Sequence, residues 1–370
     1  MPRPTYAEVD LGAIRHNFCA LKAQGRPGVR ILAIIKADAY GHGAAAVGLA
    51  LEQAGVDMFG VALVEEGVAL RKAGIRTPIL VMGIAPDDEV VEAMQNDLAV
   101  TVDSVCTAGA LQQVAAATGC TARVHLKLDT GMNRLGLRTE DVPEAAAAIA
   151  HMDHLKLEGA YTHFACADDD DEKPSQDQLV QLKSALAGLR SAGVMPPLVH
   201  AANSAAILKI SSAHFDMVRS GLALYGIRPF AAAPGDDLRP VLALMSRVAH
   251  LKRVRRGEGV SYGHRWRADR DSLIGVLPIG YADGYRRILS NRAQVRIADR
   301  LCPVRGTICM DATMVDLTDV PGAAVGMEAT LLEAAHDSPL SAAALAALCD
   351  TIPYEILTGI SSRVPRVYIE

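Results

Sequence analysis

Short apolar runs alternate with segments of helical character over the first 220 residues, and this alternation limits the possible folds more than any other feature. The eight runs are 31–35, 58–62, 78–82, 98–102, 122–128, 157–163, 197–201 and 216–220. Helical patterns cover 64–73, 104–118, 140–152 and 176–192, and another over 11–23, with Asp10 as its expected N-cap, precedes the first run. Strands that alternate with helices form βαβ units and a parallel sheet. Eight such units predict a (β/α)8 barrel of the TIM type.

A doubly wound open sheet is the alternative, but it would normally need fewer strands, and no G-x-G-x-x-G follows the first strand. The pattern changes near Pro229, where RPFAAAPGDDLRP is typical of a linker. Runs typical of β-strands, separated by turns, follow it, with one clear helix at 341–348. We therefore expect the barrel over residues 1–234 and an all-β domain over 235–370. Residues 1–10 are expected to form a strand that joins the second domain.

Composition excludes several classes of protein. The chain has 370 residues and a formal net charge of −5, which argues against a nucleic-acid-binding protein. No apolar run approaches the roughly 20 residues that span a bilayer, and the N-terminus does not resemble a signal peptide. The seven cysteines include no C-x-x-C pair, so neither a disulfide framework nor a metal site is expected. A cytoplasmic protein without a membrane partner fits these features.

Basic residues lie at the ends of two predicted strands, where (β/α)8 barrels carry their active-site groups. Lys36 ends the first strand; a lysine there forms a Schiff base, acts as a base, binds an anion or simply ends the strand. Alternation in HLKLDTGMNRLG points Lys127 into the barrel, with Arg134 in the following loop. A buried ammonium needs a partner or a changed charge state, and an ion pair with Asp129 is the alternative to a functional role.

The later strand ends add a possible phosphate site. His163 ends the sixth strand, as a functional or a hydrogen-bonded core histidine. Phosphate sites recur after strands seven and eight of such barrels. The residues there are Asn203, Ser204, Arg219, Gly221 and Leu222. A lysine suited to an imine and a phosphate site in one barrel mouth indicate pyridoxal phosphate; a sugar-phosphate aldolase is the alternative, although its lysine more often lies on a later strand.

Nine motifs identify a resemblance that spans essentially the whole chain. In order they are IIKADAYGHG, KLDTGMNRLG, THFACAD, ANSAAI, VRSGLALYG, VSYGHRW, GYADGY, CMD and ISSRVPR. The set resembles the bacterial alanine racemases. The resemblance implies a pyridoxal 5'-phosphate enzyme that interconverts L- and D-alanine, for peptidoglycan or for alanine catabolism. It also implies a head-to-tail homodimer with active sites shared between subunits. A racemase of broader specificity, acting on serine or lysine, remains an alternative.

The resemblance also implies residue roles. Lys36 would form the internal aldimine and act as one of two bases, with Tyr262 of the partner subunit as the other. Arg219 would contact the pyridine nitrogen, and His163 would contact Arg219. The implied phosphate-binding set is Tyr40, Ser204, Gly221, Leu222 and Tyr354, with Asn203 beside it.

Further roles concern the substrate. Arg134 would contact the cofactor's phenolic oxygen and the substrate carboxylate. Met310 and Asp311 would border the substrate from the partner subunit. Lys127 matches a lysine that is often carbamylated in the family, and a carbamate would replace the repulsion between Lys127 and Arg134 by a charge-assisted contact. His42, in the same motif as Lys36, receives no chemical role and is expected to be structural.

Overall fold

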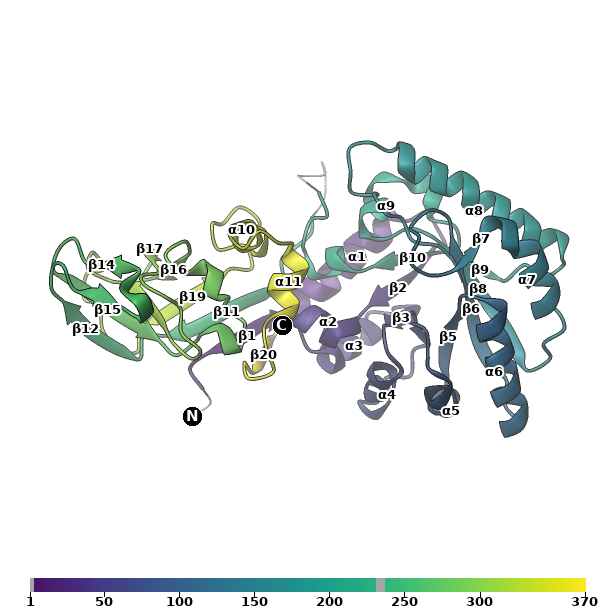
Figure 1. Cartoon of the computed structure of the whole chain (residues 1–370), viewed down its shortest axis with the longest axis horizontal. Coiled ribbons are helices and arrows are strands. Elements are labelled where there is room, and N and C mark those ends of the chain that lie inside the picture. The colour runs from purple at the N-terminus through teal and green to yellow at the C-terminus, as the bar shows by residue number, and fades with distance from the viewer. Residues whose placement is uncertain (1–2, 231–236) are drawn as a thin grey trace.

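A closed parallel barrel forms the first part of the molecule in the computed structural model, which describes residues 3–230 and 237–370. Within these residues, eight parallel strands pair in the order β2–β3–β4–β5–β6–β8–β9–β10, and β10 closes on β2 (Figure 1). They are β2 (Arg30–Ile34), β3 (Met58–Val61), β4 (Ile79–Val81), β5 (Leu98–Val102), β6 (Ala122–Asp129), β8 (Leu155–Tyr161), β9 (Leu198–His200) and β10 (Met217–Ser220). A short strand, β7 (Leu137–Arg138), adds to β6. The predicted barrel is confirmed, with a strand in each predicted run.

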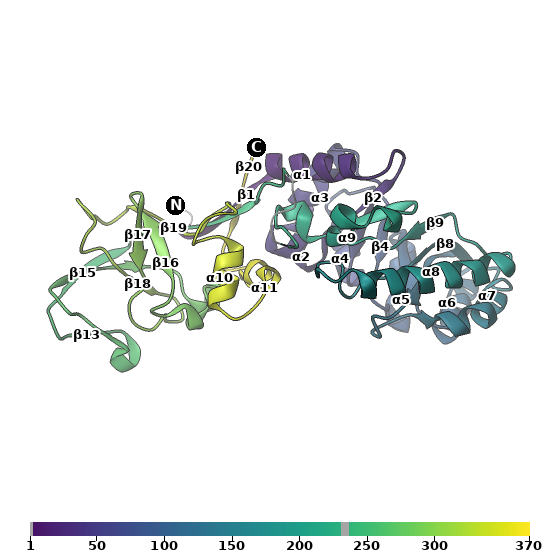
Figure 2. The ribbon, with the colours of Figure 1, turned by 90° about the horizontal axis from the view of Figure 1, so that it is seen from above.

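Helices surround this barrel (Figures 1 and 2). They are α1 (Leu11–Gln24), α2 (Lys36–Gly41), α3 (Ala44–Gln53), α4 (Val64–Lys72), α5 (Asp87–Gln95), α6 (Val105–Thr118), α7 (Val142–Ile149), α8 (Lys173–Ser191) and α9 (Ser204–Lys209). Asp10 caps α1 as predicted, because its carboxylate accepts from the Ala13 N–H at 2.8 Å. The sequence did not indicate α3 or α5; α3 is apolar and alanine-rich.

The second domain consists mainly of antiparallel strands. They are β11 (Leu242–Arg247), β12 (His250–Val254), β13 (Gly259–Val260), β14 (Trp266–Arg267), β15 (Ser272–Leu277), β16 (Gln294–Ile297), β17 (Arg300–Pro303), β18 (Thr313–Asp316), β19 (Glu328–Leu332) and β20 (Arg366–Ile369). Two helices, α10 (Ala342–Leu348) and α11 (Pro353–Thr358), lie in its described residues. The single helix expected from the sequence was an undercount, because α11 is short and begins at a proline. The expected boundary between residues 234 and 235 lies outside the described residues.

Short 3-10 helices complete the described chain. They are η1 (Thr139–Asp141), η2 (Ser211–Ala213), η3 (Leu222–Tyr225), η4 (Tyr262–His264), η5 (Tyr281–Asp283) and η6 (Arg287–Leu289). No helix in residues 3–230 or 237–370 is long and apolar enough to cross a membrane. No group of three or more His, Cys, Asp or Glu side chains in the described residues could hold a metal ion.

The two ends of the chain connect the domains. Strand β1 (Tyr6–Asp10) lies between β11 and β20 in the six-stranded sheet of the second domain and leads directly into α1 of the barrel. Helix α11 and strand β20 contact the barrel beside α2: the Arg366 Nε–H donates to the Gly41 carbonyl at 2.9 Å. One hydrophobic cluster includes residues of both domains, such as Ile14 and Leu357. The C-terminal end of the chain is therefore fixed beside the end of the first barrel strand.

Gly226 offers a test of the packing where the barrel ends. Its φ is +74°, and a Cβ there would lie 1.9 Å from the Arg239 carbonyl oxygen. Gly193 has the same φ of +74° but nothing within 4 Å of an added Cβ. We expect Gly226→Ala to lower the free energy of unfolding by about 1–3 kcal/mol more than Gly193→Ala, because only the former adds overpacking to backbone strain. Urea denaturation of both variants measures the difference; equal losses would contradict it.

Candidate active site

A cavity of about 450 Å³ opens at the C-terminal ends of the barrel strands. Five of the residues singled out from the sequence that line it come before residue 170: Lys36, Tyr40, Lys127, Arg134 and His163. Six more come from later in the chain: Asn203, Ser204, Arg219, Gly221, Leu222 and Tyr354. Tyr354 comes from α11, so the second domain of the same chain contributes to the cavity.

Lys36 and Tyr40 stand at the two ends of a left-handed turn. Ala37, Asp38, Ala39 and Tyr40 have φ between 52° and 54°, and the Ala39 N–H donates to the Ile35 carbonyl at 2.9 Å. Left-handed helix costs about 1–2 kcal/mol per L-residue, because the Cβ approaches the following carbonyl oxygen. Such strain persists only where the surroundings determine the conformation. The turn brings the Lys36 and Tyr40 side chains to the same cavity.

His42 is one of the side chains that hold this turn. It is fully buried, and its Nδ1 lies 2.9 Å from the Ala39 carbonyl oxygen and 3.0 Å from that of Tyr40. Carbonyls only accept, so Nδ1 carries the proton. Burial lowers the pKa of His42 to about 4, which keeps the ring neutral. The ring stacks on Tyr225 at 4.5 Å, and the Tyr225 hydroxyl donates to Ile34 in β2. The structural role of His42 is therefore to fix the carbonyls of Ala39 and Tyr40 in the turn and to pack on Tyr225.

Hydroxyl donors converge at one corner of the cavity. The Ser204 Oγ accepts from the N–H groups of Gly221 and Ala223, at 3.0 and 3.2 Å, so its own proton is available to a further acceptor. A Cβ on Gly221 would lie 2.9 Å from the Tyr40 Oη, so a larger residue there would displace that hydroxyl. Burial raises the pKa of Tyr40 and of Tyr354, which keeps both phenols protonated as donors. This corner suits a phosphate-like anion.

Basic side chains outnumber acidic ones around the cavity. Those that line it are Lys36, Lys127, Arg134, Arg219 and Arg228, against Asp168. Burial, with the charges of Arg219 and Arg134, lowers the pKa of Lys127 to about 6. Burial and the Arg134 charge also lower the pKa of Lys36. The alternative ion pair of Lys127 with Asp129 is not formed: the Asp129 carboxylate accepts from the N–H groups of Gly131 and Asn133. The surplus of positive charge favours an anionic ligand.

A chain of hydrogen bonds runs inward from the cavity through Arg219. Its Nη2 lies 3.1 Å from the His163 Nδ1 and its Nη1 lies 3.3 Å from the His200 Nδ1. The His200 Nε2 lies 2.9 Å from the His125 Nδ1. Arginine only donates, so His163 and His200 accept at Nδ1 and are neutral. Burial, and next the Arg219 charge, lowers the pKa of His163 to about 2. Burial lowers the pKa of Arg219 to about 10, so it stays protonated at neutral pH.

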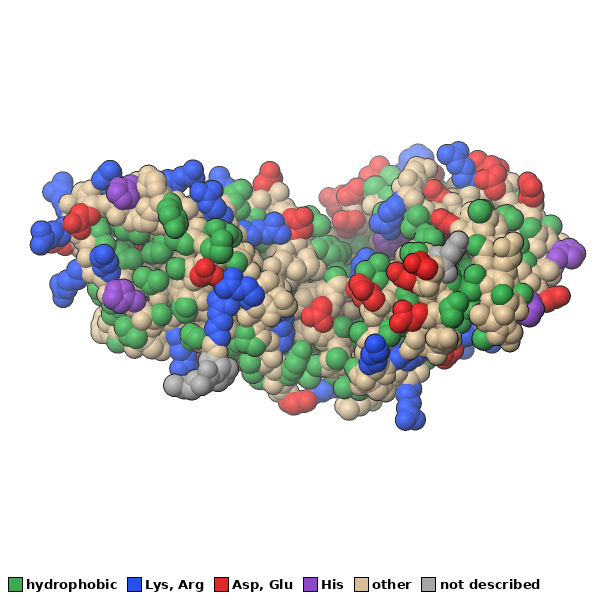
Figure 3. All heavy atoms as spheres, turned by 60° about the horizontal axis from the view of Figure 1, so that its bottom comes forward, with side chains coloured by type: hydrophobic (Ala, Val, Ile, Leu, Met, Phe, Trp, Pro, Cys, Tyr) green, Lys and Arg blue, Asp and Glu red, His purple; other side chains and the backbone are tan. Residues whose placement is uncertain are grey.

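Three predicted site residues do not line the cavity of their own chain. Tyr262, in η4, is 72% exposed and Met310 is 53% exposed, and Asp311 is also exposed. Their segments lie side by side: the Thr307 hydroxyl donates to the Tyr262 carbonyl at 2.9 Å. On one face of the molecule a hollow separates the two domains, with basic side chains prominent over the second domain and acidic ones over the barrel (Figure 3). Within one chain, these three side chains therefore lie outside the cavity.

Comparison with known proteins identifies the family. Residues 9–229 match the family model described as "Alanine racemase, N-terminal domain", and residues 241–368 match "Alanine racemase, C-terminal domain". The chain belongs to the alanine racemase family. As a member of this family it is an isomerase that interconverts L- and D-alanine.

Individual relatives agree over the full length. The chain is 43% identical over 369 residues to the alanine racemase of Desulfovibrio desulfuricans, which covers 100% of this chain and 99% of that one. The alanine racemase structure of Clostridium difficile 630 matches with a TM-score of 0.95 and 37% identity, covering 100% of this chain and 97% of that one. That of Bacillus anthracis with bound L-Ala-P gives a TM-score of 0.94 and 35% identity, with coverage of 100% and 96%. None of these relatives favours the broader racemase.

The racemase cavity contains residues that the sequence did not single out. Tyr161 lines it; its hydroxyl lies 2.8 Å from the Thr101 Oγ1, and its ring is parallel to His200 with centroids 4.8 Å apart. The Lys127 Nζ lies 4.7 Å from the Tyr161 ring centroid. Tyr161 precedes His163 by two residues at a strand end, so alternation places both on one face. That spacing was the signal that could have identified it.

The contact between His42 and the left-handed turn can be tested with His42→Phe. This change keeps a ring against Tyr225 but removes the donor to the Tyr40 carbonyl. We expect the free energy of unfolding to fall by about 1–3 kcal/mol, because a buried acceptor loses its partner. Racemase kcat/KM should fall as well, because Lys36 sits on the same turn. The control is His151→Phe, an exposed histidine bonded to the Ala147 carbonyl at 2.8 Å, which should change stability by less than about 0.5 kcal/mol.

Proposed function

We propose that the chain racemises alanine with pyridoxal 5'-phosphate in the barrel cavity, using one base from each of two subunits. The observation that carries the proposal is the placement of Lys36 in the same cavity as the hydroxyl corner formed by Tyr40, Ser204 and Tyr354. An amine and a phosphate-like site in one cavity fit this cofactor. When bound, the cofactor supplies an electron sink for negative charge at the α-carbon of the substrate.

The residues present fit the cofactor at three points. Lys36 would anchor it, and the corner with Gly221 and Leu222, with Asn203 beside it, would hold the phosphate. Arg219 would hold the ring nitrogen: its Nε–H makes no hydrogen bond within the described residues, and its pKa of about 10 means that it donates without losing its proton. Arg134 would contact the phenolic oxygen and the substrate carboxylate. The L-Ala-P bound to the Bacillus anthracis relative supports a small-molecule substrate in this cavity.

Lys36 acts as the base on one face of the α-carbon. A lysine amine must be neutral to accept a proton, and burial with the nearby Arg134 charge lowers the pKa of Lys36 in that direction. Because the pKa is lowered, the neutral fraction at a given pH is larger than for a free lysine and rises as the pH rises. At neutral pH, more of the Lys36 amine is therefore free to accept a proton than in an unperturbed lysine.

Tyr262 of a second copy acts on the opposite face. The exposure of Tyr262 and Met310 and their position outside their own cavity support a homodimer in which each second domain completes the partner's site. His163 would face the incoming tyrosine as a neutral imidazole whose Nε2 carries the proton. Met310 and Asp311 would border the substrate.

Lys127 is proposed to carry a carbamate. With a pKa of about 6 its amine is largely neutral at pH 7, and a neutral amine attacks carbon dioxide. The nitrogen forms a bond to the carbon of carbon dioxide, one C=O bond of which becomes the C–O⁻ of the carbamate, and one N–H proton leaves to solvent, which converts a neutral amine into an anion. The anion would then orient Arg134 by a charge-assisted contact.

The cellular role follows from the product. We propose that D-alanine is supplied for peptidoglycan, or that D-alanine is consumed in alanine catabolism, in the cytoplasm, where the seven cysteines, all unpaired here, would stay reduced. We also propose that the chain divides into a barrel domain over 1–234 and a second domain over 235–370, with residues 1–10 joining the sheet of the second domain. The pairing of β1 with β11 and β20 supports the assignment of residues 1–10.

The activity and its division between subunits can be tested together. Purified protein with L-alanine should produce D-alanine, and L-serine and L-lysine should react much more slowly. Lys36→Ala and Tyr262→Phe should each lower turnover by about 10²–10⁴-fold, the usual contribution of a general acid or base. A heterodimer of the two variants, isolated with different affinity tags, contains one site with both bases and should recover about half the wild-type rate.

Failure of the proposed activity and failure of the shared site give different results. No D-alanine from cofactor-loaded wild type would refute racemisation. An inactive heterodimer would instead place both bases within one chain and refute the shared site.

Carbamylation of Lys127 can be detected in solution. Protein equilibrated with ¹³C-bicarbonate at pH 8 should give a carbamate ¹³C resonance that Lys127→Met lacks and that exposed Lys183→Met retains. The signal should decline as the pH falls below about 6, because the amine becomes protonated there. A wild-type spectrum without this resonance at pH 8 would contradict the modification.

A further inference from the structure

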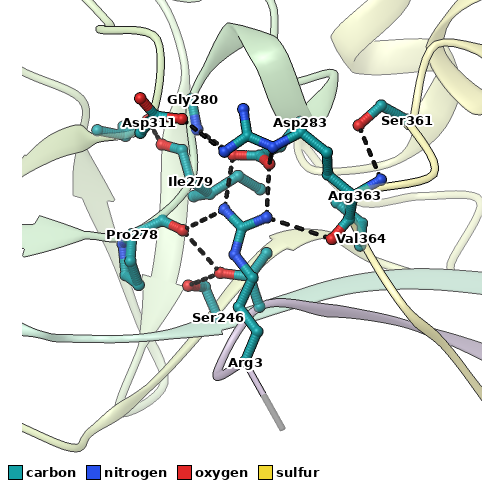
Figure 4. Close-up of polar contacts among 12 residues, drawn as sticks. Arg3, Ser246, Pro278, Ile279, Gly280, Asp283, Asp311, Ser361, Arg363 and Val364 are labelled. Atoms are coloured by element: carbon teal, nitrogen blue, oxygen red, sulfur yellow. Dashed lines mark hydrogen bonds and ion pairs between the residues drawn. The ribbon is translucent and has the colours of Figure 1, made fainter.

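A fully buried carboxylate, Asp283, lies between two arginines that come from opposite ends of the chain (Figure 4). Arg3 makes a bidentate contact with it, through Nη1–Oδ1 at 2.6 Å and Nη2–Oδ2 at 2.8 Å. The Arg363 Nε lies 3.5 Å from the same Oδ1, and the Gly280 N–H donates to Oδ2 at 3.0 Å. Asp283 belongs to GYADGY and Arg363 to ISSRVPR, two motifs without a role in the proposed reaction.

Arg363 connects this buried carboxylate to a loop on the surface. Its Nη2 donates to the Asp311 Oδ1 at 2.6 Å, so one guanidinium contacts both Asp283 and Asp311. Asp311 follows Met310 in the loop 309–311, both exposed side chains. The orientation of the Asp311 carboxylate is therefore determined by a group that is itself held by the buried carboxylate.

The backbone of loop 309–311 rests directly on the segment that carries Asp283. The N–H groups of Tyr281 and Ala282 donate to the Cys309 and Met310 carbonyls, at 3.0 and 3.1 Å. A Cβ on Gly280 would lie 2.2 Å from the Cys309 oxygen, so this approach requires glycine. A change in the position of Asp283 would consequently move the loop.

Arg3 anchors the other side of Asp283. Besides the carboxylate, it donates to the Pro278 carbonyl at 2.9 Å and to that of Arg363 at 3.3 Å. Burial alone would raise the pKa of Asp283, but the hydrogen bonds from Arg3 and Gly280 and the two guanidinium charges hold it below its ordinary value. The carboxylate therefore stays ionised at neutral pH and keeps both arginines bound.

We infer that Asp283 and Arg363 are positioning residues that hold Met310 and Asp311 at the substrate of a second copy of the chain, with Arg3 fixing Asp283 from the N-terminal segment. The inference rests on the proposed function, in which this loop borders the partner's site. The network contains neither Lys36 nor Tyr262. Its disruption should therefore weaken alanine binding more than proton transfer.

The first measurement uses homodimers. Arg363→Gln should raise the KM for alanine by about 10- to 100-fold with a smaller change in kcat, as expected when a binding group is misplaced. Arg363→Lys should recover part of the loss, because it retains the charge but reaches only one carboxylate at a time. Arg270→Gln removes an exposed ion pair with Asp319 in the same domain and should leave both constants unchanged. Equal KM values for wild type and Arg363→Gln would overturn the inference.

The second measurement separates positioning from general stability. In the heterodimer of Lys36→Ala and Tyr262→Phe chains, the intact site takes its loop from the Lys36→Ala chain. Arg363→Gln on that chain should raise KM, whereas on the Tyr262→Phe chain it should not, although both heterodimers carry the same three substitutions. An equal effect from both positions, or none from either, would overturn the inference. If the heterodimer without Arg363→Gln is inactive while the wild type is active, the shared site is refuted, and so is the premise of this inference.

Discussion

The left-handed turn after the first barrel strand is the constraint on which the site depends. Four consecutive residues are held where L-amino acids are strained, and the contacts that hold them come from both domains. His42 holds the carbonyls from inside, and the Ala37 N–H donates to Glu66 at 2.6 Å. Arg366 of the second domain holds Gly41. The strain is offset by these contacts, so the position of the lysine amine is a property of the whole chain.

Positive charge in the barrel mouth is the second determinant. Burial, and next the charges of neighbouring arginines, lowers the pKa of Lys36 and of Lys127. Lys127, with a pKa of about 6, is largely neutral at pH 7, whereas Arg219, with a pKa of about 10, stays protonated. Two lysines can then act as neutral amines while the arginines bind anions. His163 and His200 contact Arg219 without adding charge, because each is neutral and accepts a hydrogen bond from it.

Sequence patterns were sufficient for the architecture and for most of the cavity. Apolar runs bounded by turns located all eight barrel strands, and their ends located the cavity residues, because parallel strands place those ends at one rim. Short elements without a clear pattern were missed, such as α11. So were contacts between distant segments: Arg3 gives no local sign of its partner 280 residues away. Tyr161 was missed although its spacing of two residues from His163 places both side chains on one face.

The position of β1 has a consequence for synthesis of the chain. Residues 6–10 are synthesised before the barrel, yet they pair on one side with β20, which is synthesised after the other strands described here. Barrel strands can pair as they emerge, but β1 stays unpaired on that edge until β20 has been synthesised. Arg366 and Tyr354 arrive only then. A nascent chain therefore acquires its complete cavity only after the second domain has been synthesised, and a chain that folds its barrel before then lacks the groups that finish the site.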